Sequence, residues 1–95
     1  MITKSYVIFV AYASYGHYEM NTKMFVAENQ EFVEKMAKDW LYENVLVFFE
    51  KNASITTETI RQKFEEESLD NLIGYIHEHS VAHVQTQLYS YYSSV

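Results

Sequence analysis

The stretch Tyr6-Val7-Ile8-Phe9-Val10-Ala11-Tyr12 is the segment around which the other elements of this chain can be arranged. Every side chain in it is apolar or aromatic, and neither Gly nor Pro interrupts it. A short unbroken run rich in β-branched and aromatic residues predicts a strand that is covered on both faces. We expect this strand to extend over Thr3–Ala13 and to lie at the centre of a sheet.

Alternation along this strand gives it two different faces. One face would carry Tyr6, Ile8, Val10 and Tyr12, and the other would carry Val7, Phe9, Ala11 and Ala13. The second set is smaller, which predicts that the helices pack against it. A hairpin turn over Ser14–Glu19 and a second, more polar strand over Met20–Ala27 follow, and the polar character suits a sheet edge.

The middle of the chain has helical periodicity from Gln30 onward. Asn29 is a good N-cap, and apolar side chains recur at intervals of three and four at Val33, Met36, Ala37, Trp40 and Leu41. Val45–Phe49 allows two interpretations, either the buried end of a helix reaching about Lys51 or a separate strand. Because no Gly or Pro precedes this segment, we favour the helix.

Two shorter helices are expected next, Thr57–Glu67 capped by Thr56 and Leu69–Glu78 capped by Ser68. Gly74 lies inside the second of these helices, where Gly costs about 1 kcal/mol relative to Ala. This cost predicts a close contact with a neighbouring element.

From Val81 the pattern changes to a period of two, which predicts a last strand. Its core-facing side would carry Ala82, Val84, Thr86, Leu88 and Ser90. Its solvent-facing side would carry His83, Gln85, Gln87, Tyr89 and Tyr91.

These elements predict a single α+β domain over residues 1–95. The expected architecture is a three-stranded antiparallel sheet of order 2-1-3 with two or three helices packed on one face. Such a sheet exposes its far face, where we expect Tyr6, Tyr12, Tyr89 and Tyr91.

The composition excludes several classes of function but does not identify the function itself. The net charge of −6 disfavours direct binding of nucleic acid or of an anionic membrane, because phosphate binding needs clustered Lys and Arg. No window is apolar enough for a membrane span, and the N-terminus lacks a signal-peptide pattern. The cytoplasm is therefore the expected location, and the absence of Cys excludes disulfides and thiol chemistry.

No constellation of residues indicates catalysis. There is no Ser in a recognisable motif, and two Gly residues cannot build a phosphate-binding loop. We expect no enzyme activity and no cofactor. The alternative is a metal-binding regulator or enzyme that uses His77, His79 and His83, although the change of pattern at Val81 separates His83 from the other two and zinc usually takes four ligands.

Acidic residues gather in the second half of the chain, where residues 58–95 carry six acidic and two basic side chains. The densest part comprises Glu65, Glu66, Glu67 and Asp70. A surface of this kind predicts a partner protein with a basic or nucleic-acid-binding surface.

The nine tyrosines are the most unusual feature of the composition. Tyr12, Tyr15 and Tyr18 crowd the predicted hairpin, and Tyr89, Tyr91 and Tyr92 crowd the C-terminus. Tyr is enriched at protein interfaces because it covers a large area and carries a hydrogen-bonding tip. These residues predict an aromatic surface that binds another protein or a second copy of this chain, in the latter case as a homo-oligomeric structural protein.

The segment Lys23-Met24-Phe25-Val26-Ala27-Glu28-Asn29-Gln30-Glu31-Phe32 looks like the strand-then-helix module of many small orphan proteins. The short, acidic, Tyr-rich and Cys-free chain is similar in composition to small bacteriophage accessory proteins that bind and inhibit host factors. This resemblance implies an inhibitor of a host or defence factor that handles nucleic acid, located in the cytoplasm of a bacterial host.

Overall fold

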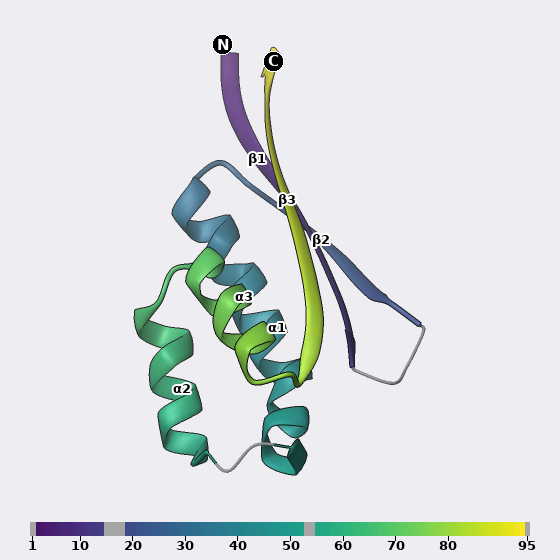
Figure 1. Cartoon of the computed structure of the whole chain (residues 1–95). Helices are drawn as coiled ribbons and strands as arrows, with labels where there is room; N and C mark the ends of the chain where they lie inside the picture. The colour runs from purple at the N-terminus through teal and green to yellow at the C-terminus, as the bar shows by residue number, and fades with distance from the viewer. Residues whose placement is uncertain (1, 15–18, 53–54, 95) are drawn as a thin grey trace.

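The computed structural model of the chain describes residues 2–14, 19–52 and 55–94. It contains a three-stranded antiparallel sheet and three helices in the order β-β-α-α-α-β, which confirms the predicted α+β fold. The helices lie together on one side of the sheet, as Figure 1 shows.

The long strand β1 (Ile2–Ser14) lies between β2 (Asn21–Ala27) and β3 (Ala82–Ser94), so the predicted order 2-1-3 is confirmed. β1 pairs with β3 along its entire length, from Ile2 opposite Ser94 to Ser14 opposite Ala82. β2 pairs only with residues 6–12 of β1. The start of β1 and the end of β3 therefore project past the helices as a two-stranded ribbon (Figure 1).

The helix α1 (Gln30–Asn52) is continuous, which confirms the helical interpretation of Val45–Phe49. Its fully buried side chains occur at every fourth position: Val33, Ala37, Leu41, Val45 and Phe49. Residues 45–49 thus continue the single apolar stripe by which α1 faces the core. The predicted N-cap is also present, since the Asn29 side chain accepts a hydrogen bond from the Phe32 N–H at 3.0 Å.

The two shorter helices, α2 (Thr57–Glu66) and α3 (Leu69–Glu78), begin at the predicted caps. The Thr56 hydroxyl accepts from the Thr59 N–H, and the Ser68 hydroxyl accepts from the Asn71 N–H, both at 3.2 Å. α2 packs on α1, and α3 lies against α1 and the start of β3. None of the three helices, within the described residues, combines the length and the apolar character needed to cross a membrane.

Gly74 corrects one prediction. Its position on α3 is exposed, and a Cβ added there would meet no neighbouring heavy atom within 4 Å. The close contact that we expected is therefore wrong, and the Gly costs helix stability without a packing reason.

The two faces of β1 are the reverse of the prediction. Ile8, Val10 and Tyr12 are buried under the helices, whereas Phe9 on the opposite face is 45% exposed. The larger side chains fill the space between sheet and helices, and the smaller set lies on the other face of the strand. The prediction that β1 is covered on both faces is therefore wrong, because all the helices lie on one side.

Tyr12 is a core residue and does not lie on the exposed face. Its hydroxyl donates to Asn44 Oδ1 at 3.1 Å, and Asn44 Nδ2 in turn donates to the Trp40 carbonyl at 2.7 Å. The Tyr12 ring also meets the Trp40 ring edge to face, with centroids 5.3 Å apart. Burial raises the pKa of Tyr12 above its ordinary value of 10.0. Tyr6 shares this face and packs partly against the core.

Candidate protein-binding surface

The sheet face turned away from the helices, here called the open face, is built of three rows across β2, β1 and β3. The register places Val7 between Val26 and Tyr89, Phe9 between Met24 and Gln87, and Ala11 between Thr22 and Gln85. Tyr91 extends the face along β3, opposite Ser5. Alternation therefore collects side chains from three strands on one surface.

The open face is apolar to an unusual degree for a surface. Five of its side chains have exposed fractions between 45% and 52%: Phe9, Met24, Val26, Tyr89 and Tyr91. The Phe9 and Tyr89 rings meet edge to face with centroids 6.1 Å apart, and the Tyr89 hydroxyl donates to Gln87 Oε1 at 2.8 Å. A contiguous exposed group of this kind is typical of an interaction site.

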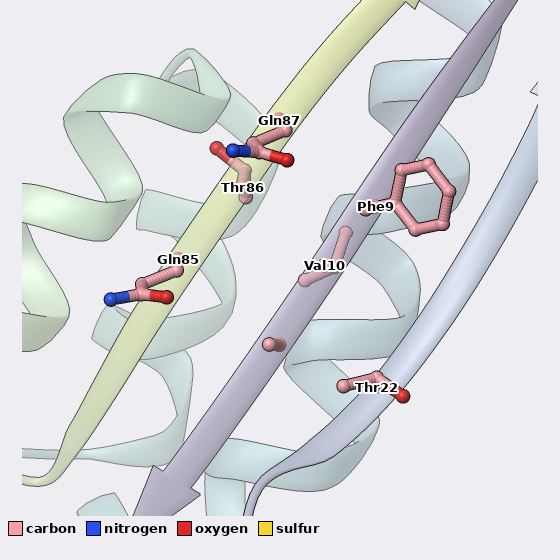
Figure 2. Close-up of a pocket in the computed structure, with 7 residues that line it drawn as sticks. Phe9, Val10, Thr22, Gln85, Thr86 and Gln87 are labelled. Atoms are coloured by element: carbon pink, nitrogen blue, oxygen red, sulfur yellow. The ribbon is translucent and has the colours of Figure 1, made fainter.

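A shallow hollow of about 490 Å³ lies in the middle of the open face, where the small Ala11 side chain forms its floor. Figure 2 shows the Phe9 ring at one end, with Thr22 on β2 and Gln85 and Gln87 on β3 along the sides. The larger neighbours rise around Ala11 and leave a depression that a partner's side chain can occupy.

The chemistry of the hollow suits recognition and offers no catalytic group. Phe9 and Ala11, the Thr22 hydroxyl and the Gln85 and Gln87 amides line it from the open face, together with Val10 and Thr86, whose side chains lie on the helix side of the sheet. None of these side chains carries a charge or titrates near neutral pH. The amides can both donate to and accept from the peptide groups of a protein, whereas phosphate binding would need Lys or Arg.

The structure separates the predicted tyrosines into different places. Tyr89 and Tyr91 lie on the open face, as the alternation of the last strand predicted, and Tyr12 lies in the core. Tyr92 is exposed on the opposite face of the projecting ribbon, where Lys4 Nζ lies 5.7 Å from its ring centroid. Tyr15 and Tyr18 fall outside the described residues.

The acidic residues lie in the helical layer, on the side opposite the open face, so they do not join Tyr89 and Tyr91 in one surface. Glu66 accepts from Gln62 at 3.0 Å, and Glu67 accepts from Asn71 at 3.1 Å.

Positive charge lies close to these carboxylates. Glu65 shares a groove between α1 and α2 with Lys35, Lys38 and Arg61, and Lys63 Nζ lies 3.8 Å from a Glu67 carboxylate oxygen. The groove thus carries charges of both signs, and Asp70 is exposed near the start of α3. This surface is less strongly acidic than the sequence predicted.

The three histidines do not converge on one point. The His77 and His83 rings stack nearly parallel with centroids 5.3 Å apart, and His77 Nε2 accepts the Val84 N–H at 3.0 Å. His79 packs instead against the Phe49 and Tyr75 rings. Among the residues that the structure describes, no three His, Asp or Glu side chains are grouped so that they could hold a metal ion. The geometry gives the metal-binding alternative no support.

Sequence reasoning missed three residues of the open face, namely Phe9, Met24 and Val26. We assigned Phe9 to the helix-packed face and gave the second strand no role in binding. A signal was available, because an antiparallel pair places side chains of matched register on the same face. Because Tyr89 was assigned to the solvent-facing side, the register between the first and last strands would have placed Val7 and Phe9 beside it.

Comparison of the chain with protein-family models, with curated proteins and with solved structures finds no significant match. The function must therefore be argued from the surface itself.

Proposed function

We propose that this protein acts by binding another protein through the open face of its sheet. The observation that carries the proposal is the contiguous set of half-exposed apolar and aromatic side chains Phe9, Met24, Val26, Tyr89 and Tyr91. Aromatic residues and Met are enriched at the centres of protein interfaces, where charged residues are depleted.

The chemistry of the face indicates what kind of partner surface it fits. Its rows carry no Lys, Arg, Asp or Glu, so it complements a neutral, apolar patch of a protein. Gln85 and Gln87 border the hollow and supply directional hydrogen bonds at the edge of the apolar area. We expect a partner side chain to fill the hollow above Ala11.

The acidic residues on the helices support a second proposal, that of an inhibitor that docks on a basic, nucleic-acid-binding surface of its partner. The supporting observation is the exposure of Glu65, Glu66 and Asp70. Because cations lie beside Glu65, this proposal has weaker support than binding through the open face.

The test compares variants of matched chemistry in a capture experiment from the native cell, followed by direct titration of the captured protein. The face variant Phe9→Ser/Tyr89→Ser removes two exposed rings from the open face. The control variant Phe32→Ser/Val47→Ser removes two exposed apolar side chains from α1, where their exposed fractions are 56% and 42%. A third variant, Glu66→Lys/Asp70→Lys, reverses charge on the helices.

The open-face proposal expects the face variant to weaken binding at least about tenfold while the other two bind like the unmodified protein, since central aromatic residues carry most interface energy. Unchanged binding by the face variant would overturn it. Loss confined to the charge-reversal variant would support the inhibitor proposal instead.

A further inference from the structure

The outer edge of β3 lacks the usual protection of an edge strand. In natural proteins, charged side chains, Pro or bulges protect edge strands from pairing with another chain, because the unpaired backbone groups of an edge bind readily to another strand. Ala82–Ser94 contains no Lys, Arg, Asp, Glu, Gly or Pro, and its register with β1 runs without a bulge. The opposite edge strand, β2, is half as long and carries Lys23.

His77 shows which backbone groups of β3 face outward. Its Nε2 accepts the Val84 N–H, so that N–H points away from β1. Because backbone direction alternates in an antiparallel pair, the same outer edge presents the peptide groups of Thr86, Leu88, Ser90 and Tyr92. His77 thus occupies the outward N–H at the start of this edge. Residues 87–92, further along β3, are all exposed.

Leu88 indicates that the helical layer is incomplete beside this edge. It lies on the helix side of the sheet directly opposite Ile8, yet Leu88 is 40% exposed while Ile8 is 1% exposed. The helix α3 lies beside the first part of β3, and the later part of the strand extends past the helices (Figure 1). An aliphatic side chain next to an unpaired edge therefore remains available for contact with a further element.

We propose that a second copy of this chain pairs with this edge, β3 against β3 in antiparallel orientation, and joins the two sheets into one of six strands. The edge is self-complementary, because its outward peptide groups can pair with the same groups of an identical antiparallel strand, and this favours a second copy as the occupant. Each chain carries a net charge of −6, and two acidic molecules can approach without like-charge contacts along a thirteen-residue strand that has no charged side chain. Antiparallel pairing of a strand with its own copy is also two-fold symmetric and closes at the dimer.

The four outward positions select a register. Pairing Thr86 with Tyr92 of the second copy, and Leu88 with Ser90 of the second copy, uses all four outward positions of both strands. This register places Tyr89 directly opposite its own counterpart on the open face. The two Tyr89 residues then form a non-hydrogen-bonded pair, whose Cα atoms are typically about 4.5 Å apart.

This dimer goes beyond the proposed function, because it uses the strand edge and leaves the open face of each copy accessible. The two open faces would become neighbours in one continuous sheet. A failure of dimerisation would leave the binding proposal untouched, and a failure of partner binding would leave the dimer untouched.

The first test is the mass in solution by sedimentation equilibrium at micromolar concentrations. The expected result is a species of twice the 11.3 kDa of one chain. A monomer at all these concentrations would overturn the proposal. The variant Ser90→Lys places two like charges at the paired edges and should restore the monomer, whereas the control Thr22→Lys on β2 should remain dimeric.

The second test uses the absence of Cys from the chain, which makes a single introduced thiol an unambiguous probe. Under mild oxidation Tyr89→Cys should form a disulfide-linked dimer rapidly, because a Cα separation near 4.5 Å lies within disulfide range. The matched control Met24→Cys, on the same face but on β2, should remain largely unlinked. Equal linkage of both variants would indicate random collision and would overturn the proposal.

Discussion

Phe9 and Tyr89 contact one another edge to face on the uncovered side of the sheet, with ring centroids 6.1 Å apart. The two residues come from β1 and β3 and are diagonal neighbours, since Phe9 lies opposite Gln87 and Tyr89 opposite Val7. Each ring holds the other in place while about half of each side chain remains exposed to solvent. A preformed aromatic pair of this kind loses little conformational freedom when a partner covers it.

The first prediction contrasts two tyrosines of opposite location. Tyr12→Ala should lower the free energy of unfolding by about 3 kcal/mol or more, because it empties a buried site and removes the hydroxyl that contacts Asn44. Tyr89→Ala should cost less than about 1 kcal/mol, since it removes only an exposed cross-strand ring contact. Urea unfolding at one fixed protein concentration measures both changes. Similar losses for the two variants would contradict the assignment of Tyr89 to the open face.

The second prediction concerns alkaline pH. Burial raises the pKa of Tyr12, so above the ordinary value of 10.0 the unfolded chain releases this proton before the folded chain does. The unfolded state then binds fewer protons, and stability decreases with rising pH. Tyr12→Phe has no proton to lose at this position, so its stability deficit at neutral pH should shrink above about pH 10. A deficit that stays constant up to about pH 11 would contradict the prediction.

The third prediction concerns the hydrogen bond that His77 accepts from the Val84 N–H at the edge of β3. His77→Ala removes the acceptor of the Val84 N–H and should lower the free energy of unfolding by about 0.5–1.5 kcal/mol. His83→Ala, which removes the exposed ring stacked on His77, is the matched control and should cost less. Chemical denaturation of both variants gives the comparison. Equal costs would argue that the hydrogen bond to Val84 contributes nothing.

The fourth prediction concerns Gly74. Gly74→Ala should raise the free energy of unfolding by about 0.5–1 kcal/mol. The added Cβ meets no neighbouring atom in the folded state, and Ala has a smaller conformational entropy than Gly in the unfolded chain. Thermal unfolding followed by circular dichroism would show a higher midpoint temperature. A lower midpoint would mean that the site is constrained in a way that the structure does not show.

The sequence predicted the elements well because local signals mark them. Asn29, Thr56 and Ser68 each bond the N–H group three residues later, so each helix begins where a side chain can satisfy its first donors. The helix was favoured over residues 45–49 because no Gly or Pro interrupts the chain there, and in the structure Val45 and Phe49 continue the four-residue spacing of buried side chains on α1.

The sequence predicted the face of β1 wrongly because alternation defines two sets and does not say which set faces the helices. Size was a poor guide: the layer between sheet and helices needed large side chains, and Ile8, Val10 and Tyr12 supplied them. Tyr12 is tolerated there because Asn44, from a distant part of the sequence, accepts a hydrogen bond from its hydroxyl. Such long-range partners leave no local signal. The sequence therefore placed Tyr89 and Tyr91 on the exposed face, whereas Phe9, Met24 and Val26 joined them only when the strands were paired.

The most direct test of the central claim is hydroxyl-radical footprinting of the free protein and of its complex with the captured partner. In the free protein we predict rapid oxidation of Phe9, Met24 and Tyr89, and of Phe32 on α1 as an internal reference. In the complex the three open-face residues should be protected while Phe32 keeps its rate. Protection of Phe32 with unchanged oxidation of Phe9, Met24 and Tyr89 would contradict the account.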